Sequence, residues 1–192
     1  MSTYVPWGEK EADWPVKIQE AGSVEKLLDE GSIPVLLKSN ESRTLGVVLD
    51  ANDKLETRWS QIRTRCVAVF PNCPGRCPRE GLVLANQENR RFGVWIMPDN
   101  ESHGMLETFL MHLVPPPLVP LRTFAETAVN EARSRGAQFR EPHRDKAVIH
   151  TWLAWQDPPG RPFGVALANR ILDPDSSVAG PFVSWFRGLF EL

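Results

Sequence analysis

Apolar and polar positions in the first part of the chain alternate between the periods of helices and of strands. Residues 22–29 have helical spacing and predict a short helix. Residues 45–49 form a continuous apolar run rich in β-branched side chains, which is typical of a strand buried on both faces of a parallel sheet. Residues 55–65 predict a second helix that begins with a capping box of Asp53 and Glu56. The buried face of this helix is expected to carry Leu55, Trp59, Ile62 and Cys66.

Shorter apolar stretches predict the remaining strands. Residues 16–19 and 66–70 are two such stretches. Residues 71–80, which read PNCPGRCPRE, predict a rigid loop because they are dense in proline, glycine and cysteine. The alternating segments 82–85 and 92–97 predict two strands that are joined as a hairpin.

Helical periodicity dominates from residue 104 onward. A first helix is expected to end at the proline-rich segment 115–120, and further helices are expected at 121–135, 145–155, 164–172 and 181–190. Alternating strands and helices, then a hairpin, then helices predict an α/β fold. This fold has a sheet with flanking helices and a helical C-terminal portion. We expect a surface arm over residues 1–15 and one domain over 16–192.

The composition narrows the class of protein. Hydrophobic residues make up 42% of the 192 positions and charged residues 24%, which excludes a wholly disordered chain. The formal net charge of −2 gives no overall basic excess, so contact with nucleic acid requires a local patch. No apolar run approaches the roughly 20 residues that cross a bilayer, and the charged N-terminus is unlike a signal peptide. Three cysteines without a secretion signal predict a protein of the reducing cytoplasm without a disulfide framework. Since the chain has neither a spanning run nor an overall basic excess, we expect no contact with membranes.

The strongest candidate chemistry follows the apolar run at 45–49. Asp50 comes directly after this strand and Asn52 follows two positions later. Open α/β folds bind ligands at the carboxyl edge of the sheet, and paired oxygen side chains there suit Mg²⁺. The alternative is that Asp50, Asn52 and Asp53 are ordinary turn and cap residues.

A second strand end repeats this arrangement. Asp99 and Asn100 follow the apolar segment 92–97, and Glu107 comes about two helical turns later. If both strands belong to one sheet, Asp50, Asn52, Asp99 and Glu107 are predicted to converge as ligands of one Mg²⁺ ion. The alternative is that Asp99 closes a turn and that Glu107 interacts with the dipole of its helix.

One local concentration of basic side chains is a candidate phosphate-binding surface. Its members are Arg133, Arg135, Arg140, Arg144 and Lys146. They predict contact with DNA or RNA phosphates, although a solvated helix end explains them almost as well. Lys146 differs because it begins the helix that carries Trp152, so it can supply a fixed charge to a phosphoryl oxygen or be a plain surface lysine.

Two familiar classes of site have no counterpart. Cys73 and Cys77, with Cys66 upstream, have no fourth ligand at zinc-site spacing, so we expect no zinc. Neither a phosphate-binding GxxxxGK[ST] loop nor a GxGxxG motif occurs, so we expect no bound nucleotide.

Several long segments carry a family resemblance. They read GSVEKLL (22–28), LGVVLDAND (45–53), RWSQIR (58–63), FGVWIMPDNESHGMLETFL (92–110), HRDKAVIHTWLAWQDPPGRPFG (143–164) and FVSWFRGLF (182–190). In this order they resemble an uncharacterised bacterial branch of the Toprim (topoisomerase–primase) superfamily, related to the nuclease domain of OLD-type (overcoming lysogenization defect) proteins. The resemblance covers nearly the whole chain from residue 16 onward. It implies a Toprim-like sheet, a divalent metal ion and, in better-known relatives, phosphodiester chemistry on nucleic acid.

The resemblance also assigns roles to single residues. It places the strand-end acidic pair on Asp50 and Asn52, the later acidic motif on Asp99 and Glu107, and the basic catalytic residue on Lys146. Asn52 stands where this pair normally has a second Asp, which lowers the charge of the site. The first Toprim strand, which ends in Glu-Gly, has no counterpart, so the glutamate that serves as general acid/base or metal ligand is missing. An in-frame Glu-Gly strand upstream of Met1 would reveal a misassigned start.

Two functions are therefore compatible with the sequence. The first is a Mg²⁺-dependent, nuclease-type phosphodiester site in a degenerate form. The second is a non-catalytic module that binds nucleic acid or a partner ATPase, as OLD-type domains work beside an ATPase. Without the first Toprim strand, an edge of the sheet is left unpaired, which invites a homodimer or cover by the arm 1–15.

Overall fold

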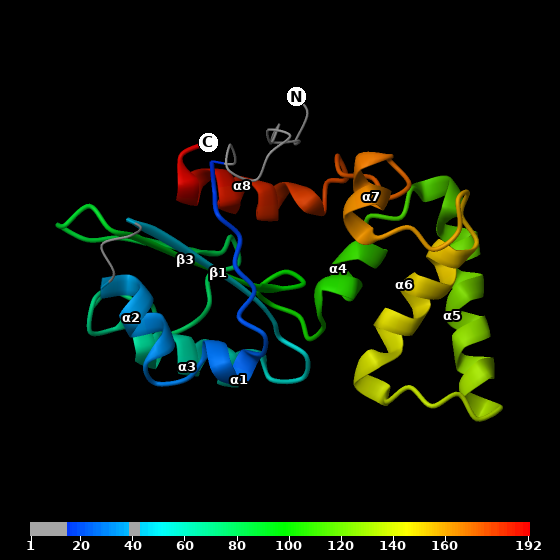
Figure 1. Cartoon of the computed structure of the whole chain (residues 1–192), viewed down its shortest axis with the longest axis horizontal. Coiled ribbons are helices and arrows are strands. Elements are labelled where there is room, and N and C mark those ends of the chain that lie inside the picture. Colours follow the sequence, from blue (N-terminus) through cyan, green and yellow to red (C-terminus); the bar gives the residue numbers. More distant parts are fainter. Residues whose placement is uncertain (1–14, 39–42) are drawn as a thin grey trace.

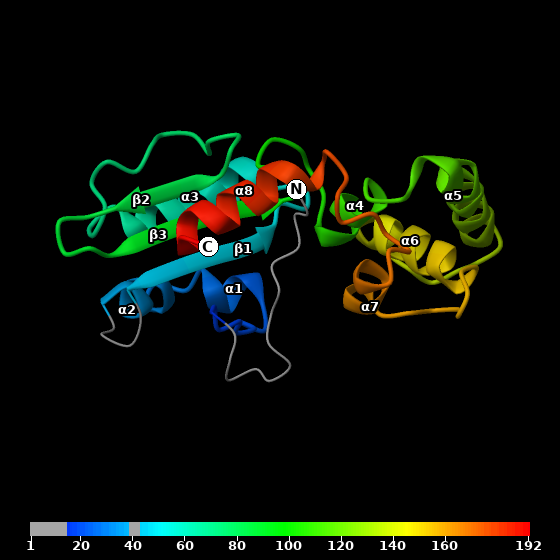
Figure 2. The same ribbon diagram turned by 90° about the horizontal axis from the view of Figure 1, so that it is seen from above.

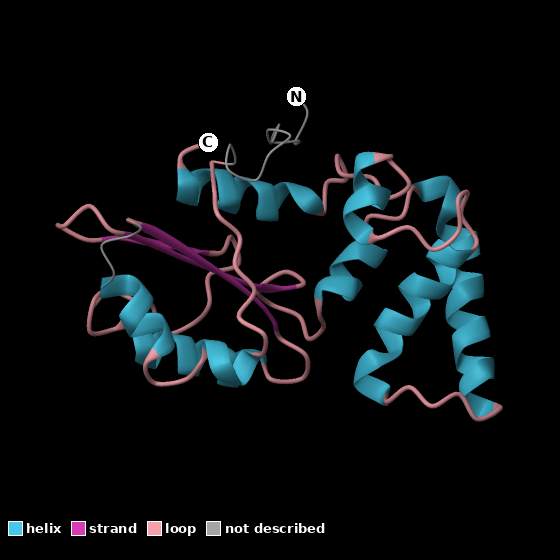
Figure 3. Ribbon diagram, viewed as in Figure 1, coloured by secondary structure: helices cyan, strands magenta, loops and turns pink. Residues whose placement is uncertain are grey.

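A computed structural model of the chain describes residues 15–38 and 43–192. Its sheet has three strands in the order β1-β3-β2, namely β1 (Thr44–Asp50), β2 (Leu82–Ala85) and β3 (Arg91–Met97). β1 pairs with β3 in parallel, whereas β2 and β3 form an antiparallel hairpin. The α/β class, the parallel pairing of the apolar run and the hairpin are therefore confirmed. Figure 3 shows how the strands form a single sheet while helices make up most of the rest.

The central position of β3 explains its continuous apolar sequence. Every residue from Phe92 to Met97 is buried, because both faces of β3 are covered and both of its edges are paired. The prediction that residues 45–49 are buried on both faces is wrong for one face. Val48 is 46% exposed, since β1 is an edge strand in the described sheet.

Helices cover the two faces of the sheet (Figures 1 and 2). On one face lie α1 (Val24–Leu27), α2 (Ser32–Lys38) and α3 (Leu55–Cys66). As predicted, α3 buries Leu55, Trp59, Ile62 and Cys66, and these pack with the β3 side chains Phe92, Val94 and Ile96. The alternation of strand side chains turns Trp95 and Met97 to the opposite face.

The last helix, α8 (Ala179–Phe190), covers that opposite face. Trp185 is 4% exposed and lies at 5.7 Å, between ring centroids, from Trp95. The indole Nε1–H of Trp185 donates a hydrogen bond of 2.8 Å to the carbonyl oxygen of Leu82 on β2. This satisfies the polar atom of a large apolar side chain, so α8 is held to the sheet by both packing and a directed bond.

Between β3 and α8 the chain forms a helical lobe that lies beside the sheet (Figure 1). It contains α4 (Leu106–Met111), α5 (Val119–Ser134), α6 (Arg144–Ala154) and α7 (Phe163–Ala168), with short 3₁₀ turns at Pro116–Leu118 and Glu141–His143. Trp152 and Ile149 of α6 are fully buried in its core. The predicted helical C-terminal portion is confirmed.

Several local predictions are wrong for identifiable reasons. Residues 16–19 form no strand, and residues 66–70 are the end of α3 followed by a turn in which the Phe70 N–H bonds the Cys66 carbonyl at 2.9 Å. The capping box of Asp53 and Glu56 is absent, since Lys54 occupies the N-cap of α3. The proline-rich segment does not end α4. That helix ends at Met111, and Pro116 begins a 3₁₀ turn that leads into α5, because proline suits the first turn of a helix.

Two further expectations concern the N-terminal arm and membrane-spanning helices, and they can be compared only with the described residues. The arm 1–15 lies outside them except for Pro15, which is exposed. None of the helices in residues 15–38 and 43–192 is long and apolar enough to cross a bilayer.

Candidate functional site

The carboxyl end of β1 contacts the beginning of α4. Asp50 Oδ1 accepts a hydrogen bond of 2.9 Å from the backbone N–H of Leu106, the first residue of α4. Burial raises the pKa of Asp50 above its ordinary value, and the neighbouring charge of Glu107 raises it further. The Leu106 N–H and the Lys146 ammonium act in the opposite direction. Asp50 is therefore a carboxylate that is partly desolvated and has another carboxylate close by.

Glu107 is the second carboxylate of this cluster. It lies in the first turn of α4, and its side chain is only 9% exposed. The Lys146 ammonium, from the first turn of α6, lies 3.4 Å from Glu107 Oε1. Three elements that are distant in sequence thus bring Asp50, Glu107 and Lys146 together. This convergence gives the predicted residues a shared electrostatic environment.

A second interaction lies immediately beside the ion pair. Thr108 Oγ1 donates a hydrogen bond of 2.6 Å to Asp145 Oδ2 and accepts one of 3.0 Å from the Met105 N–H. Consecutive residues of α4 therefore contact consecutive residues of α6. The Thr108–Asp145 pair sets the position of both helix starts, and it places Lys146 against Glu107. Sequence reasoning missed Thr108 and Asp145, although their adjacency to Glu107 and Lys146 was a usable signal.

Asn52 contributes to the site through its backbone. Its N–H donates to the Gly104 carbonyl at 2.6 Å, and the Gly104 N–H donates to the Asn52 carbonyl at 2.8 Å. This bridge ties the turn after β1 to the loop before α4. Asn52 has a φ of +51°, a conformation that asparagine tolerates better than most residues.

Asp99 is engaged within its own turn. Its Oδ1 accepts hydrogen bonds from the backbone N–H groups of Glu101 (3.0 Å) and Ser102 (2.7 Å), and its Oδ2 accepts one from the Ser102 hydroxyl (2.9 Å). These contacts are those of a residue that closes a loop. The structure thus gathers Asp50, Glu107 and Lys146, whereas the carboxylate of exposed Asp99 bonds the loop that follows it.

Asn100, the neighbour of Asp99, is a buried polar residue whose importance sequence reasoning did not detect. It is 2% exposed, and its Oδ1 accepts a hydrogen bond of 2.7 Å from the Ile96 N–H. Its Nδ2 donates to the Arg79 carbonyl at 3.1 Å. Asn100 therefore joins the end of β3 to the proline-rich loop 71–80, and it holds the turn that follows β3 in place.

The predicted basic surface is largely paired with acids. Arg133 contacts Glu141, Arg135 contacts Glu131 at 2.8 Å, and Arg144 contacts Asp145 at 3.6 Å. These ion pairs reduce the positive charge that the surface presents to a phosphate. Arg140 is exposed on the same α5–α6 connection.

Cys66 is the last residue of α3, and Cys73 and Cys77 belong to the 71–80 loop; the first two are buried and Cys77 is half-buried. Cys66 Sγ and Cys73 Sγ lie 3.4 Å apart, and all three side chains are free thiols. Burial raises the pKa of Cys66 and of Cys77 to about 12, so both stay protonated at neutral pH. Over residues 15–38 and 43–192, no three or more His, Cys, Asp or Glu side chains form a group that could hold a metal ion.

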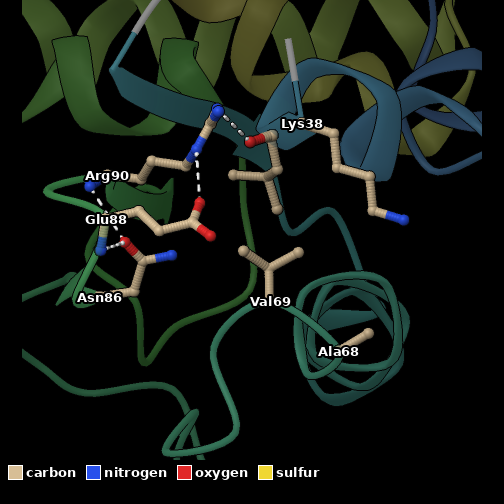
Figure 4. A pocket seen from close by; sticks show the side chains of 7 residues that line it. Lys38, Ala68, Val69, Asn86, Glu88 and Arg90 are labelled. Carbon is tan, nitrogen blue, oxygen red and sulfur yellow. Dashed lines mark hydrogen bonds and ion pairs between the residues drawn. The ribbon is translucent and has the colours of Figure 1, made fainter. Parts of the chain in front are cut away.

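One hollow in the described part of the chain lies elsewhere. About 380 Å³ in volume, it is lined by residues of α2, the turn that follows α3 and the β2–β3 hairpin (Figure 4). There Arg90 donates to the Leu37 carbonyl at 2.8 Å and pairs with Glu88 at 3.2 Å. Since β1 and β3 are parallel, this hairpin lies at the opposite end of the sheet from Asp50. The hollow therefore does not belong to the carboxylate–lysine cluster.

Fold and cluster together define an α/β protein in which a parallel strand pair and a helical lobe assemble two carboxylates and a lysine. The chain belongs to the family described as Protein of unknown function (DUF3226), whose family model matches residues 2–191. Searches of the curated proteins and of the solved structures found no match.

Proposed function

We propose that the chain carries a degenerate Toprim-like site, with an incomplete set of the superfamily's residues, for a divalent cation and a phosphodiester. The observation that supports it is the convergence of Asp50 from β1, Glu107 from α4 and Lys146 from α6. These are three of the five residues that the resemblance assigns to the site. Their types match the chemistry, since carboxylates hold hard cations and an ammonium attracts phosphate.

The donor set fits Mg²⁺. Magnesium commonly uses one or two protein carboxylates and completes its octahedron with water and substrate phosphates. Asp50 and Glu107 provide two carboxylates, and the charge of Glu107 is close enough to raise the pKa of Asp50. The other predicted ligands, Asn52 and Asp99, flank them in the adjoining turns, and Asp99 would give up hydrogen bonds in order to join. Bound there, Mg²⁺ would supply positive charge to a phosphate and acidify a water molecule.

Lys146 is the residue that we assign to the phosphate. Its side chain is more than half exposed, so it is accessible to a ligand that approaches Glu107 from solvent. A lysine of this kind supplies a positive charge that stabilises a phosphate oxygen. The proposed site therefore contains groups for cation and phosphate binding, but the general acid/base glutamate of the superfamily has no assigned counterpart.

This assignment leads us to expect weak Mg²⁺ binding and little or no cleavage of DNA by the chain alone. The test is incubation of linear and supercoiled DNA with Mg²⁺ or Mn²⁺, beside calorimetric titration of each cation. Binding that is lost in both Asp50→Asn and Glu107→Gln would support the site. Binding that survives both substitutions would contradict it. Robust cleavage that disappears in Asp50→Ala would show a fully active nuclease instead.

A second candidate function is a non-catalytic module that binds nucleic acid or a partner ATPase in the cytoplasm. It is favoured by the engagement of Asp99 in its own turn, which leaves this carboxylate bonded to the loop rather than to the Asp50–Glu107 cluster. Under this proposal, DNA or RNA binding depends on Arg140 and Lys146 and needs no divalent cation. Electrophoretic mobility shifts in EDTA, with Arg140→Ala as the variant, separate it from the first proposal.

A further inference from the structure

The two side chains of the Lys146–Glu107 ion pair differ in their freedom to move, because that of Lys146 is largely exposed and that of Glu107 is buried. The Glu107 side chain is 9% exposed and the Lys146 side chain is 56% exposed. Lysine carries its charge on a flexible four-carbon stem, so its ammonium can leave without any movement of the backbone. Glu107 has no such freedom, because it lies buried in the first turn of α4.

The surroundings restrict movement to the lysine side chain. Next to the ion pair, the Thr108–Asp145 hydrogen bond of 2.6 Å holds the starts of α4 and α6 together. Gly104 packs against Thr108 so closely that an added Cβ would lie 2.7 Å from its hydroxyl oxygen. The backbone around Glu107 is therefore closely packed, and the ammonium can exchange with solvent while the carboxylate keeps its place.

A buried carboxylate beside another carboxylate requires a neighbouring positive charge. Leaving such a group ionised without a partner is strongly unfavourable, because desolvation and like-charge repulsion both act on it. In the structure the Lys146 ammonium supplies this charge to Glu107 and also lies close enough to influence Asp50. A divalent cation at the same carboxylates would supply it equally well, but it would repel the ammonium.

We infer that Lys146 is a built-in competitor for the divalent cation, so that Glu107 binds either the ammonium or the metal. This inference rests on the proposed function, and it adds a regulation of the same site. Cation binding expels the ammonium from Glu107 and leaves it beside the bound ion. There it is free to contact an anionic ligand. A phosphate that binds the released ammonium would then favour cation binding, because it keeps the ammonium away from Glu107. In turn, a bound cation would favour phosphate binding, because it releases the ammonium.

The test is a calorimetric titration of Mn²⁺ into the whole chain and into Lys146→Met. Removing the competitor should tighten Mn²⁺ binding by about two- to fivefold, the range expected for a partly exposed ion pair. Lys146→Arg keeps the charge and should retain the affinity of the unchanged protein. Lys38→Met is the control for overall charge, because Lys38 ends α2 near the opposite end of the sheet.

The possible outcomes separate the inference from the proposed function. If Lys146→Met binds Mn²⁺ no tighter than the unchanged protein, the competition is disproved while the site remains. If Glu107→Gln leaves the affinity for Mn²⁺ unchanged, the site itself is disproved together with the competition. The same holds if neither the unchanged protein nor any of its variants binds Mn²⁺. Crystals soaked in Mn²⁺ provide an independent measurement. The ion should lie about 2.1–2.2 Å from Glu107 with the ammonium displaced, and an ammonium that stays on Glu107 beside a bound ion would contradict the inference.

Discussion

Gly46 of β1 and Gly93 of β3 lie directly opposite each other in the parallel register, and both are in contact with Leu189 of α8. A Cβ atom at position 46 would lie 3.0 Å from a Leu189 methyl group, and one at position 93 would overlap that side chain more severely. The paired glycines thus form a shallow groove in the sheet. Leu189, which is fully buried, fills this groove.

Gly93→Ala should therefore destabilise the protein. Overpacking of a filled core position costs about 1–3 kcal/mol, and here the new methyl group must displace Leu189. The free energy of unfolding in urea measures the effect. Gly188→Ala is the matched control on α8, since nothing lies within 4 Å of its added Cβ. It should be neutral or stabilise by up to about 1 kcal/mol, and equal destabilisation by both substitutions would disprove the groove.

Asn100→Ala should lower stability by about 2 kcal/mol or more. It leaves the Ile96 N–H and the Arg79 carbonyl without their partner in a buried setting. Asn89→Ala separates this loss from backbone strain. Asn89 also has positive φ (58°, against 65° at Asn100) but is exposed. Thermal denaturation of both variants gives the comparison, and similar melting temperatures would show that backbone conformation alone matters.

Thr108→Val should destabilise the protein by about 1–2 kcal/mol, because it removes the hydroxyl shared by Asp145 and the Met105 N–H. Thr108→Ser keeps this hydroxyl and should lose less. A double-mutant cycle with Asp145→Ala isolates the interaction, and we expect a coupling energy of about 1 kcal/mol. Strict additivity would show that the two side chains do not support each other.

Asp50→Asn should stabilise the folded chain at neutral pH by less than about 1 kcal/mol, as expected for a partly exposed group. Burial and Glu107 raise the pKa of Asp50 in the folded state, with Lys146 opposing them. A raised carboxyl pKa favours folding below the ordinary value of about 4, and this contribution is lost as pH rises through the folded pKa. The gain from Asp50→Asn should consequently vanish near pH 3. Urea unfolding of both proteins across this range checks the sign, and a net loss at pH 7 would contradict it.

The strands that could be predicted are those whose burial is decided locally. The apolar run before Asp50 and the alternation around the hairpin are sufficient for β1, β2 and β3. Residues 66–70 resemble a strand equally well, yet Cys66 continues α3 because its side chain completes the buried face that Trp59 and Ile62 begin. Helical periodicity therefore determined the structure of Cys66, although the segment contains two β-branched valines. The choice between helix and strand depended on tertiary packing, which a five-residue segment of sequence does not contain.

The candidate site, too, could be predicted only in part. The nearness of Asp50 to α4 could be predicted, since parallel strands end at one edge of the sheet. Asp99 and Glu107 follow the same strand and offer the same chemistry, so the sequence could not show which would join Asp50. The turn decides it. Ser102 and Glu101 present their donors to Asp99, while the helix start carries Glu107 to Lys146.

The backbone bridge between Asn52 and Gly104 has a further consequence for ligand detection. Asp50 belongs to the sheet and Glu107 belongs to the helical lobe, so a cation held by both carboxylates would link the sheet to the lobe. It would slow local opening of the bridge, even in a chain that performs no reaction. Protection of the Asn52 and Gly104 amides from hydrogen–deuterium exchange is therefore an assay for occupants of the site. Candidate cations and phosphodiesters can be screened by this protection before any activity is known.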